Sequence, residues 1–160
     1  MDVFAHFFWA YSFLHRTKRP WLGALVGVLP DLVIFVPFMI IRIIAGNLQF
    51  GKPNINTIPN YIFIGYNFTH SLLIAAIVFG IIYLIKKKVY LFMLGWPIHI
   101  LLDIPTHTRA FFPTKFLYPL SEFTVNGVNW GTPWFMILNY SLLIITLIMI
   151  FLVSKKKLTS

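Results

Sequence analysis

Apolar residues occur in long runs along this chain, and the basic, Pro and Asn residues collect between the runs. The two longest runs, 21–45 and 134–153, approach or exceed the ~20 residues that a helix needs to cross a bilayer core. The runs at 68–85 and 89–104 are a little short, which predicts kinked or partly embedded spans. The run at 3–14 suffices only for a partial span or an interfacial helix. The pattern therefore predicts an all-α, polytopic membrane bundle of about four spanning helices with a short N-terminal helix.

The composition supports a membrane protein. Apolar residues make up 59% of the 160 residues and charged residues only 11%, against about 25% charged in a typical soluble domain. A water-soluble protein of this length could not bury so much hydrocarbon, so we expect residues 1–160 to form a single integral membrane domain. The sequence has no cysteine, which excludes disulfide and thiolate chemistry.

The net charge of +9 arises from basic clusters beside the apolar runs. These clusters are Arg16, Lys18 and Arg19; Lys86, Lys87 and Lys88; and Lys155, Lys156 and Lys157. Such clusters mark the cytoplasmic ends of membrane helices, so the charge indicates orientation and gives no reason to expect a nucleic-acid partner. With all three clusters in the cytoplasm, residues 46–66 and 105–133 form the outer loops.

Histidines and acids within the apolar segments fall at one depth. Helical rise from the cytoplasmic ends places five of them about 14–24 Å up, between the middle of the bilayer and its outer third. They are His6, Asp31, His70, His99 and Asp103. Because four segments contribute to one layer, we expect a single site in the outer half of the bilayer.

The spacing of His99 and Asp103 suits a metal ion. They are i and i+4 on a predicted helix, so one ion can bind both side chains. An isolated aspartate at membrane depth costs about 2.5–3.5 kcal/mol, and a divalent cation would neutralise both Asp31 and Asp103 while binding neutral imidazoles. Mixed imidazole and carboxylate ligands favour zinc, with manganese, iron or nickel as alternatives, and leave the number of ions open.

Each of these residues also has a structural interpretation. Asp103 could cap the last helical turn or pair with Arg109, and Asp31, which follows a proline, could cap a second half-helix. His70 could hydrogen-bond between helices, and His6 could be an interfacial histidine. We prefer a metal site because it explains the common depth of all five residues at once.

Four further polar residues bear on the site. His107 would extend the helical series by one turn, or would bind from the following loop if the proline at position 105 ends the helix. Glu122, in the second outer loop, either reaches the site or faces water. We expect His15, in the basic loop, and Asp2, near the N-terminus, to be solvated and outside the site.

The same residues occur in an order that resembles a known family. The chain carries His6, Gly-Val-Leu-Pro-Asp at 27–31, Thr-His-Ser at 69–71, His-x3-Asp at 99–103 with Thr106, and Tyr-Pro-Leu at 118–120. Over residues 1–130 this order resembles the inner-membrane metal-dependent hydrolases typified by the bacterial YdjM protein, also described as LexA-regulated hydrolases. That family is distantly similar to zinc-dependent phospholipase C, an all-helical phosphodiesterase.

The resemblance implies an inner-membrane hydrolase whose metal ligands are His6, Asp31, His70, His99 and Asp103. The chain departs from the family at Val33, where a second acid is common, and at Tyr66 and Asn67, where an arginine often precedes Thr-His-Ser. These departures argue against a second metal ion and against a phosphate-binding arginine at that place. Arg109 or Lys115 from the outer loop would then meet the phosphate.

We therefore expect a membrane-embedded hydrolase that attacks a phosphoester or other ester of a lipid-like substrate through a metal-activated water. Asp31 or Asp103 would act as general base, and loop 105–133 would admit the substrate from the membrane lipids. Two alternatives are a non-catalytic protein whose metal clamps the helices together, and a metal or proton carrier. A carrier needs polar residues that continue to the cytoplasmic side, and few occur between 74 and 85. The oligomeric state is left open.

Overall fold

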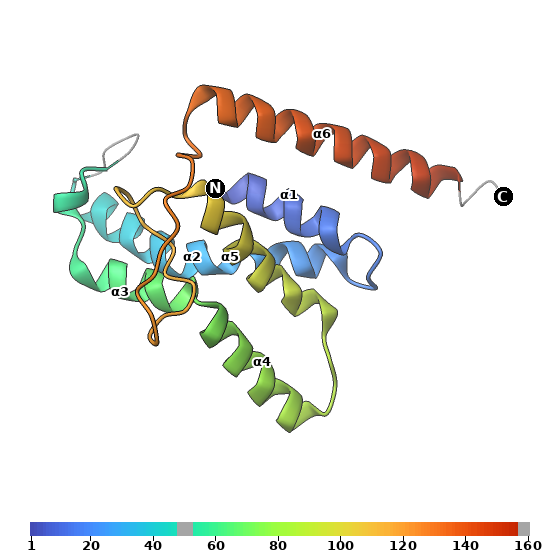
Figure 1. The fold of residues 1–160 in the computed structure, drawn as a ribbon, viewed down its shortest axis with the longest axis horizontal. Coiled ribbons are helices and arrows are strands. Elements are labelled where there is room, and N and C mark those ends of the chain that lie inside the picture. Colours follow the sequence, from blue (N-terminus) through green and yellow to red (C-terminus); the bar gives the residue numbers. More distant parts are fainter. Residues whose placement is uncertain (48–52, 157–160) are drawn as a thin grey trace.

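The computed structural model describes residues 1–47 and 53–156; residues 48–52 of the first predicted loop and Lys157 of the third basic cluster lie outside the described residues. The described ranges form an all-helical fold without β-strands, as the apolar runs predicted (Figure 1). The α-helices are α1 (Val3–Leu14), α2 (Pro20–Ile44), α3 (Asn60–Thr69), α4 (Leu72–Lys86), α5 (Gly95–Thr106) and α6 (Pro133–Lys156), with short 3-10 helices η1 (Ile55–Thr57) and η2 (Leu91–Leu94).

Two of the described helices, α2 and α6, are long and apolar enough to cross a membrane. Their bounds agree with the predicted spans 21–45 and 134–153. The prediction of about four spans is wrong by this measure, because α3 and α4 are bent by 57° and count together as at most one more span. The helices α1 and α5 have 12 residues each, which gives a length of about 18 Å.

The third apolar run is broken at His70 and Ser71, as its short length suggested. The Ser71 hydroxyl caps α4 by accepting a hydrogen bond from a backbone N–H of its first turn at 3.2 Å. The indole N–H of Trp96, on α5, donates to the carbonyl of the last α3 residue at 2.6 Å. These bonds satisfy backbone groups that the break removes from the helical ladder.

The helix α3 occupies the end of the first predicted loop, which is therefore shorter than 46–66. Residues in this stretch include several Pro and Asn, which predicted a loop, but Ile62 and Tyr66 are spaced i and i+4 and share one face. Both are buried in a cluster with Phe38 of α2 and Phe112 of the second outer loop. Burial of this face stabilises a helix that the polar residues alone disfavour.

The helices α2 and α5 approach more closely than any side chain would permit. A Cβ on Gly95 of α5 would lie 2.0 Å from the carbonyl oxygen of Gly23 and 2.8 Å from the nitrogen of Gly27. A Cβ on Gly27 would lie 2.7 Å from the Cβ of Ala10 on α1. Small residues four apart allow such contact between apolar helices, so α1, α2 and α5 form the tightly packed centre of the fold.

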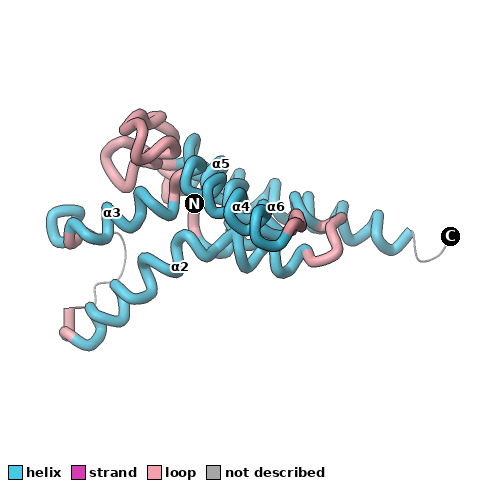
Figure 2. Tube along the Cα trace, turned by 90° about the horizontal axis from the view of Figure 1, so that it is seen from below, coloured by secondary structure: helices cyan, strands magenta, loops and turns pink. Residues whose placement is uncertain are grey.

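The second outer loop covers one end of this centre. It begins after Thr106, because α5 continues through Pro105 for one residue. Its later part returns to the end of α5, where the N–H groups of Gly127, Val128 and Trp130 donate to carbonyls of residues 105–107 at 2.8–3.1 Å. Figure 2 shows this loop gathered beside α5, while α2 and α3 diverge from each other.

The last helix, α6, runs along α1 at the edge of the molecule (Figure 1). The indole N–H of Trp9 donates to Asn139 Oδ1 at 2.9 Å, and the Tyr140 hydroxyl donates to Asp2 Oδ1 at 2.8 Å. The same Asp2 oxygen accepts from the N–H of Ala5 and caps α1. The expectation that Asp2 is merely a solvated surface charge is therefore wrong.

Candidate metal centre

Five side chains from four segments converge at the centre of the fold. His6 comes from α1, Asp31 from α2, His70 from the α3–α4 break, and His99 and Asp103 from α5. All five are buried, with no more than 7% of any residue exposed. The helical spacing of His99 and Asp103 and the convergence of separate segments agree with the sequence-based prediction.

The backbone fixes the direction of two imidazoles. His99 Nδ1 lies 2.6 Å from the carbonyl oxygen of Gly27, and His70 Nδ1 lies 3.1 Å from that of Tyr66. A carbonyl only accepts hydrogen bonds, so each Nδ1 carries a proton here, and in the neutral form of each ring Nε2 then presents a lone pair to the cluster. The two Nε2 atoms are 3.0 Å apart.

Carboxylate oxygens meet these two nitrogens. Asp103 Oδ2 lies 3.3 Å from His99 Nε2 and 3.4 Å from His70 Nε2, and Asp31 Oδ1 lies 3.4 Å from His70 Nε2 and 3.8 Å from His99 Nε2. The ligand atoms of His70, His99 and Asp103 all lie within 4.8 Å of one another, and ligands placed tetrahedrally at zinc–ligand distances would be about 3.3 Å apart. The donor types and their separations therefore fit a small divalent cation.

His6 belongs to the same cluster and has the imidazole nitrogen closest to Asp103. Its ring stacks on His99 with centroids 3.6 Å apart, and its Nε2 lies 2.9 Å from Asp103 Oδ1. Among the described residues, neither ring nitrogen of His6 makes a contact with hydrogen-bond geometry, and Asp103 Oδ2, despite its short distances to imidazoles, makes none either. His6, Asp31 and His99 form a second set of ligand atoms within 4.8 Å of one another. Buried polar atoms without hydrogen bonds are rare, and a bound ion or water is one explanation for them.

The structural interpretations of the two aspartates do not hold. Helix α2 continues without interruption through Pro30, so Asp31 does not cap a second half-helix. Arg109 donates to the carbonyl of Thr124 at 3.1 Å instead of pairing with Asp103. The positive charge closest to Asp103 in this part of the structure is the ammonium group of Met1, 2.5 Å from Oδ1.

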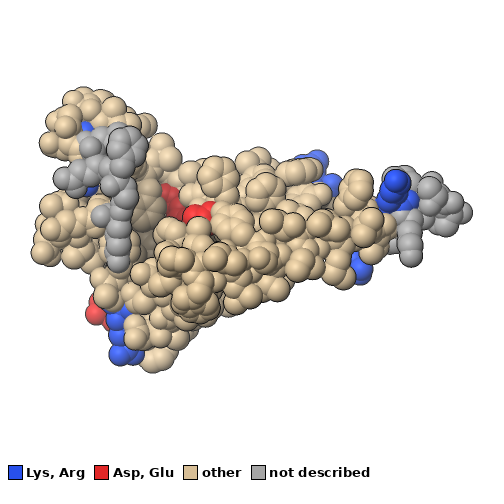
Figure 3. Space-filling model, turned by 90° about the horizontal axis from the view of Figure 1, so that it is seen from above, with Lys and Arg blue, Asp and Glu red and all other residues tan. Residues whose placement is uncertain are grey.

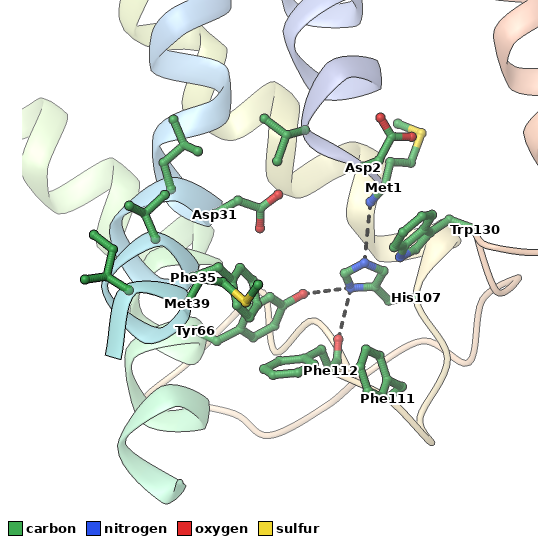
Figure 4. A pocket seen from close by; sticks show the side chains of 14 residues that line it. Met1, Asp2, Asp31, Phe35, Met39, Tyr66, His107, Phe111, Phe112 and Trp130 are labelled. Carbon is green, nitrogen blue, oxygen red and sulfur yellow. Dashed lines mark hydrogen bonds between the residues drawn. The ribbon is translucent and has the colours of Figure 1, made fainter. Parts of the chain in front are cut away.

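His107 stands at the edge of the cluster, just beyond the end of α5. Its Nε2 lies 3.7 Å from Asp103 Oδ1 and 3.4 Å from the Met1 nitrogen. Its Nδ1 lies 2.7 Å from the Tyr66 hydroxyl and 3.0 Å from the carbonyl oxygen of Phe112 (Figure 4). Burial lowers the pKa of His107 to about 4, which keeps the imidazole neutral.

A cavity of about 470 Å³ borders the cluster. Asp31, Tyr66 and His107 give it a polar edge, as Figure 4 shows. The rest of its lining is mostly apolar and includes Phe35, Val36, Met39, Ile40, Phe111 and Trp130. In Figure 3, acidic atoms are visible in a hollow with uncharged residues around it, while the basic atoms lie toward the edges of the face. The size is within the ~300–1,000 Å³ of small-molecule sites.

The remaining candidate residues lie outside the cavity and the cluster. Arg109 is bonded within the outer loop, and the Lys115 ammonium group pairs with Glu122 at 3.0 Å. Among the described residues, no lysine or arginine lines the cavity. His15 bonds to the carbonyl of Ser12 in the α1–α2 turn, at 2.7 Å. Glu122 is exposed, as one of its two interpretations predicted, and His15 is outside the site as expected.

Sequence reasoning missed three contributors to the site. In the sequence, Tyr66 stood out only as a departure from a family pattern. In the structure its ring stacks on His70, with ring centroids 3.7 Å apart, and its hydroxyl lies 2.7 Å from His107 Nδ1. Trp130 and Phe112 come from a loop whose path no periodicity reveals. For Tyr66 the available signal was its i and i+4 spacing with Ile62, which predicts that both side chains share one face.

Comparison of the chain with protein-family models, curated proteins and solved structures finds no match. The resemblance to YdjM-like hydrolases therefore stays a prediction, and function has to be argued from the site.

Proposed function

We propose that this chain is a membrane-embedded, metal-dependent hydrolase that acts on an ester of a lipid-like substrate. One observation carries the proposal: imidazole nitrogens of His70 and His99 and carboxylate oxygens of Asp31 and Asp103 converge in a buried space beside an apolar cavity. The phosphoester that the sequence resemblance implies is one candidate for the bond that is broken, and a carboxylic ester is another.

A cation explains the arrangement of the donor atoms. When both rings are neutral, the two Nε2 atoms, which are 3.0 Å apart and next to two carboxylates, repel one another through their lone pairs. Because the Nδ1 protons are directed to carbonyls, rotation of the rings would lose hydrogen bonds without removing the repulsion. A divalent ion held by His70, His99 and Asp103, with Asp31 beside it, would remove it, and this mixture of ligands favours zinc.

The two aspartates have different roles in this proposal. Bound at the centre, the divalent cation would supply the Lewis acid for ester hydrolysis. Asp31 lines the cavity, so it is our candidate for the base that takes a proton from the attacking water. Asp103 is fully buried and meets three imidazoles within 3.4 Å, which suits a ligand.

The cavity suits the apolar part of a lipid-like substrate. Val36, Met39 and Ile40 line it and are also exposed on α2, so a chain can enter from the surface of that helix. Since Arg109 and Lys115 do not line the cavity, a substrate phosphate would depend on the bound cation or on loop movement for its positive partner. Their predicted role in phosphate binding is not needed for this proposal.

The proposed setting is the inner membrane, with the centre in the outer half of the bilayer. Helices α2 and α6 would cross fully, the α3–α4 pair would cross as a bent span, and α1 and α5 would be partly embedded. The basic clusters at the α1–α2 turn and at the end of α4 support a common cytoplasmic side. The polar break at His70 then lies where protein, rather than lipid, surrounds it, as membrane folds require.

A structural metal clamp is the second candidate function. It is favoured by the connection of four segments through one buried cluster, which a bound ion would hold together. Catalysis requires access for water and substrate, and the contact of Asp31 with the cavity favours the hydrolase.

Metal content and ester hydrolysis together test the proposal. We expect detergent-purified protein to contain stoichiometric divalent metal by elemental analysis, and His99→Ala to lose it. The matched control is His15→Ala, which removes a histidine outside the cluster and should retain the metal. A panel of phospholipid and carboxylic-ester lipids then separates the two functions: metal with hydrolysis supports the enzyme, and metal without hydrolysis of any member supports the clamp. Retention of full metal by His99→Ala would reject the site.

A further inference from the structure

A second cavity lies at the other end of α1, beyond the candidate metal centre. It has a volume of about 350 Å³ and is lined by Thr17, Lys18 and Arg19 of the α1–α2 turn and by residues 89–92, which connect α4 to α5. The volume is in the range of ligand sites. Two segments far apart in the sequence thus form one concave surface.

The charge of this cavity is positive and uncompensated. Lys18 and Arg19 are exposed and make no ion pair or side-chain hydrogen bond with other residues in the described ranges. Lys88 directly precedes the second lining segment, and the carboxylates of the chain are elsewhere: three near the start of α1 and one in the second outer loop. The helix α2 also begins here without a side-chain cap, which adds a partial positive charge. The cavity therefore suits an anion.

An apolar cavity adjoins the basic one. It has a volume of about 300 Å³, lies between α4 and η2, and shares Val89 and Tyr90 with the basic cavity. Its other lining residues include Phe79, Tyr83 and Met93, and Lys88 stands at its edge. A ligand with a negatively charged head and a hydrocarbon chain would match the two cavities together.

We propose that the cavity between the α1–α2 turn and residues 89–92 binds the phosphate-bearing head group of an anionic phospholipid, with an acyl chain along the adjoining apolar cavity. Basic pockets between helices on the cytoplasmic side of membrane proteins recognise such head groups. A zwitterionic lipid would place its own cation beside Lys18 and Arg19, and a soluble anion would leave the apolar cavity unused. The inference does not depend on the metal centre or on hydrolysis.

Lipid titration of the full chain in detergent tests this site. The probes are phosphatidylglycerol, phosphatidylcholine and inorganic phosphate, and native mass spectrometry counts the bound molecules. We expect one phosphatidylglycerol to bind, with an affinity about thirtyfold lower in K18Q/R19Q, since each cation contributes about a factor of five. The matched control, K155Q/K156Q, removes the same charge at the other predicted cytoplasmic end and should bind as the parent does.

Three results would overturn the proposal. Equal loss in both double variants would mean that only net charge attracts the lipid. Equal binding of phosphatidylcholine would mean that the head-group charge is not recognised. Binding of inorganic phosphate as tight as that of phosphatidylglycerol would mean a site for a soluble anion. Because both replaced side chains are exposed, unchanged circular dichroism is the check that K18Q/R19Q is folded.

Discussion

The helices α2 and α6 are almost equal in length and hydropathy, yet the fold uses them differently. They have 25 and 24 residues, and mean hydropathies of 2.4 and 2.6 over their most apolar windows. In α2, one third of the most apolar 18-residue stretch is buried within the protein, against 11% of the corresponding stretch in α6. Helix α2 packs against α1, α3, α5 and η2, whereas α6 packs chiefly against α1.

The difference lies in a few small and polar residues. Helix α2 carries Gly23 and Gly27, which admit α5, and Asp31, which joins the buried cluster. The polar contacts of α6 are Asn139 and Tyr140, which attach it to α1 from outside. Hydropathy therefore identifies a helix that can cross a membrane, while interruptions in the apolar pattern identify a helix that organises the fold.

The largest expected effect comes from filling the contact between α2 and α5. Gly95→Ala places a methyl group 2.0 Å from a backbone oxygen, so the helices must separate, and we expect a loss of about 3 kcal/mol in the free energy of unfolding. The control is Gly80→Ala in α4, where no atom lies within 4 Å and alanine should stabilise the helix by up to about 1 kcal/mol. Reversible unfolding followed by tryptophan fluorescence measures both. Equal stability of the two variants would contradict the role assigned to this contact.

Metal removal should destabilise the part of the fold that α2 organises, because Asp31 of α2 belongs to the cluster and no described residue of α6 does. An ion present at a hundred times its dissociation constant stabilises the folded state by about 2.7 kcal/mol, and chelation should remove this amount. The variant Asp103→Asn, which loses a central ligand, should be insensitive to the chelator. If chelation leaves the parent's unfolding free energy unchanged, the cluster does not bind a metal that stabilises the fold.

A smaller effect is expected from the hydroxyl of Tyr66. Tyr66→Phe keeps the ring on His70 and the backbone carbonyl, and removes only the hydroxyl with its contacts to His107 and Thr114. We expect metal affinity to fall by about tenfold, the lower end of the range for outer partners of ligands, as measured by competition with a chromophoric chelator. Tyr83→Phe on the exposed face of α4 should change nothing. A complete loss of metal would instead make His107 an essential ligand.

The smallest effect is expected on α6. Tyr140→Phe removes one partly buried hydrogen bond to Asp2, which is worth about 1 kcal/mol. Asp2 keeps its bond to the N–H of Ala5, so α1 should remain capped and metal content should be unchanged. A loss of metal in this variant would show that α6 supports the centre, and would remove the contrast with α2.

Much of the fold was predictable because apolar runs and helix ends are local features. The run at 3–14 and the two long runs gave helix bounds close to those observed. The α3–α4 break and the start of α3 were not fully predictable, because Ser71 and Trp96 satisfy the break through contacts set by tertiary packing. The local sequence shows that an apolar run is short. It does not show where contacts with neighbouring helices allow the chain to bend.

The residues of the cluster could be predicted from their depth in the membrane, whereas the cavity beside the cluster could not be predicted. Membrane geometry restricts a polar side chain on a helix to one level, so counting residues brought His6, Asp31 and His99 to the same layer. The cavity depends on Phe112 and Trp130, which reach it through an irregular loop. Arg109 and Lys115 were assigned to the substrate from their place in that loop, and its path carries them to Thr124 and Glu122 instead.

The position of α5 in the chain has a consequence for biosynthesis. His6 and Asp31 are made early, but two further candidate ligands, His99 and Asp103, are on a helix that begins only at Gly95. While residues up to α5 are being synthesised, His6 and Asp31 are therefore without His99 and Asp103, whether in the translocation machinery or at the membrane surface. The centre can be completed only when α5 docks on the glycines of α2, and α6, which follows, then adds itself to an assembled core.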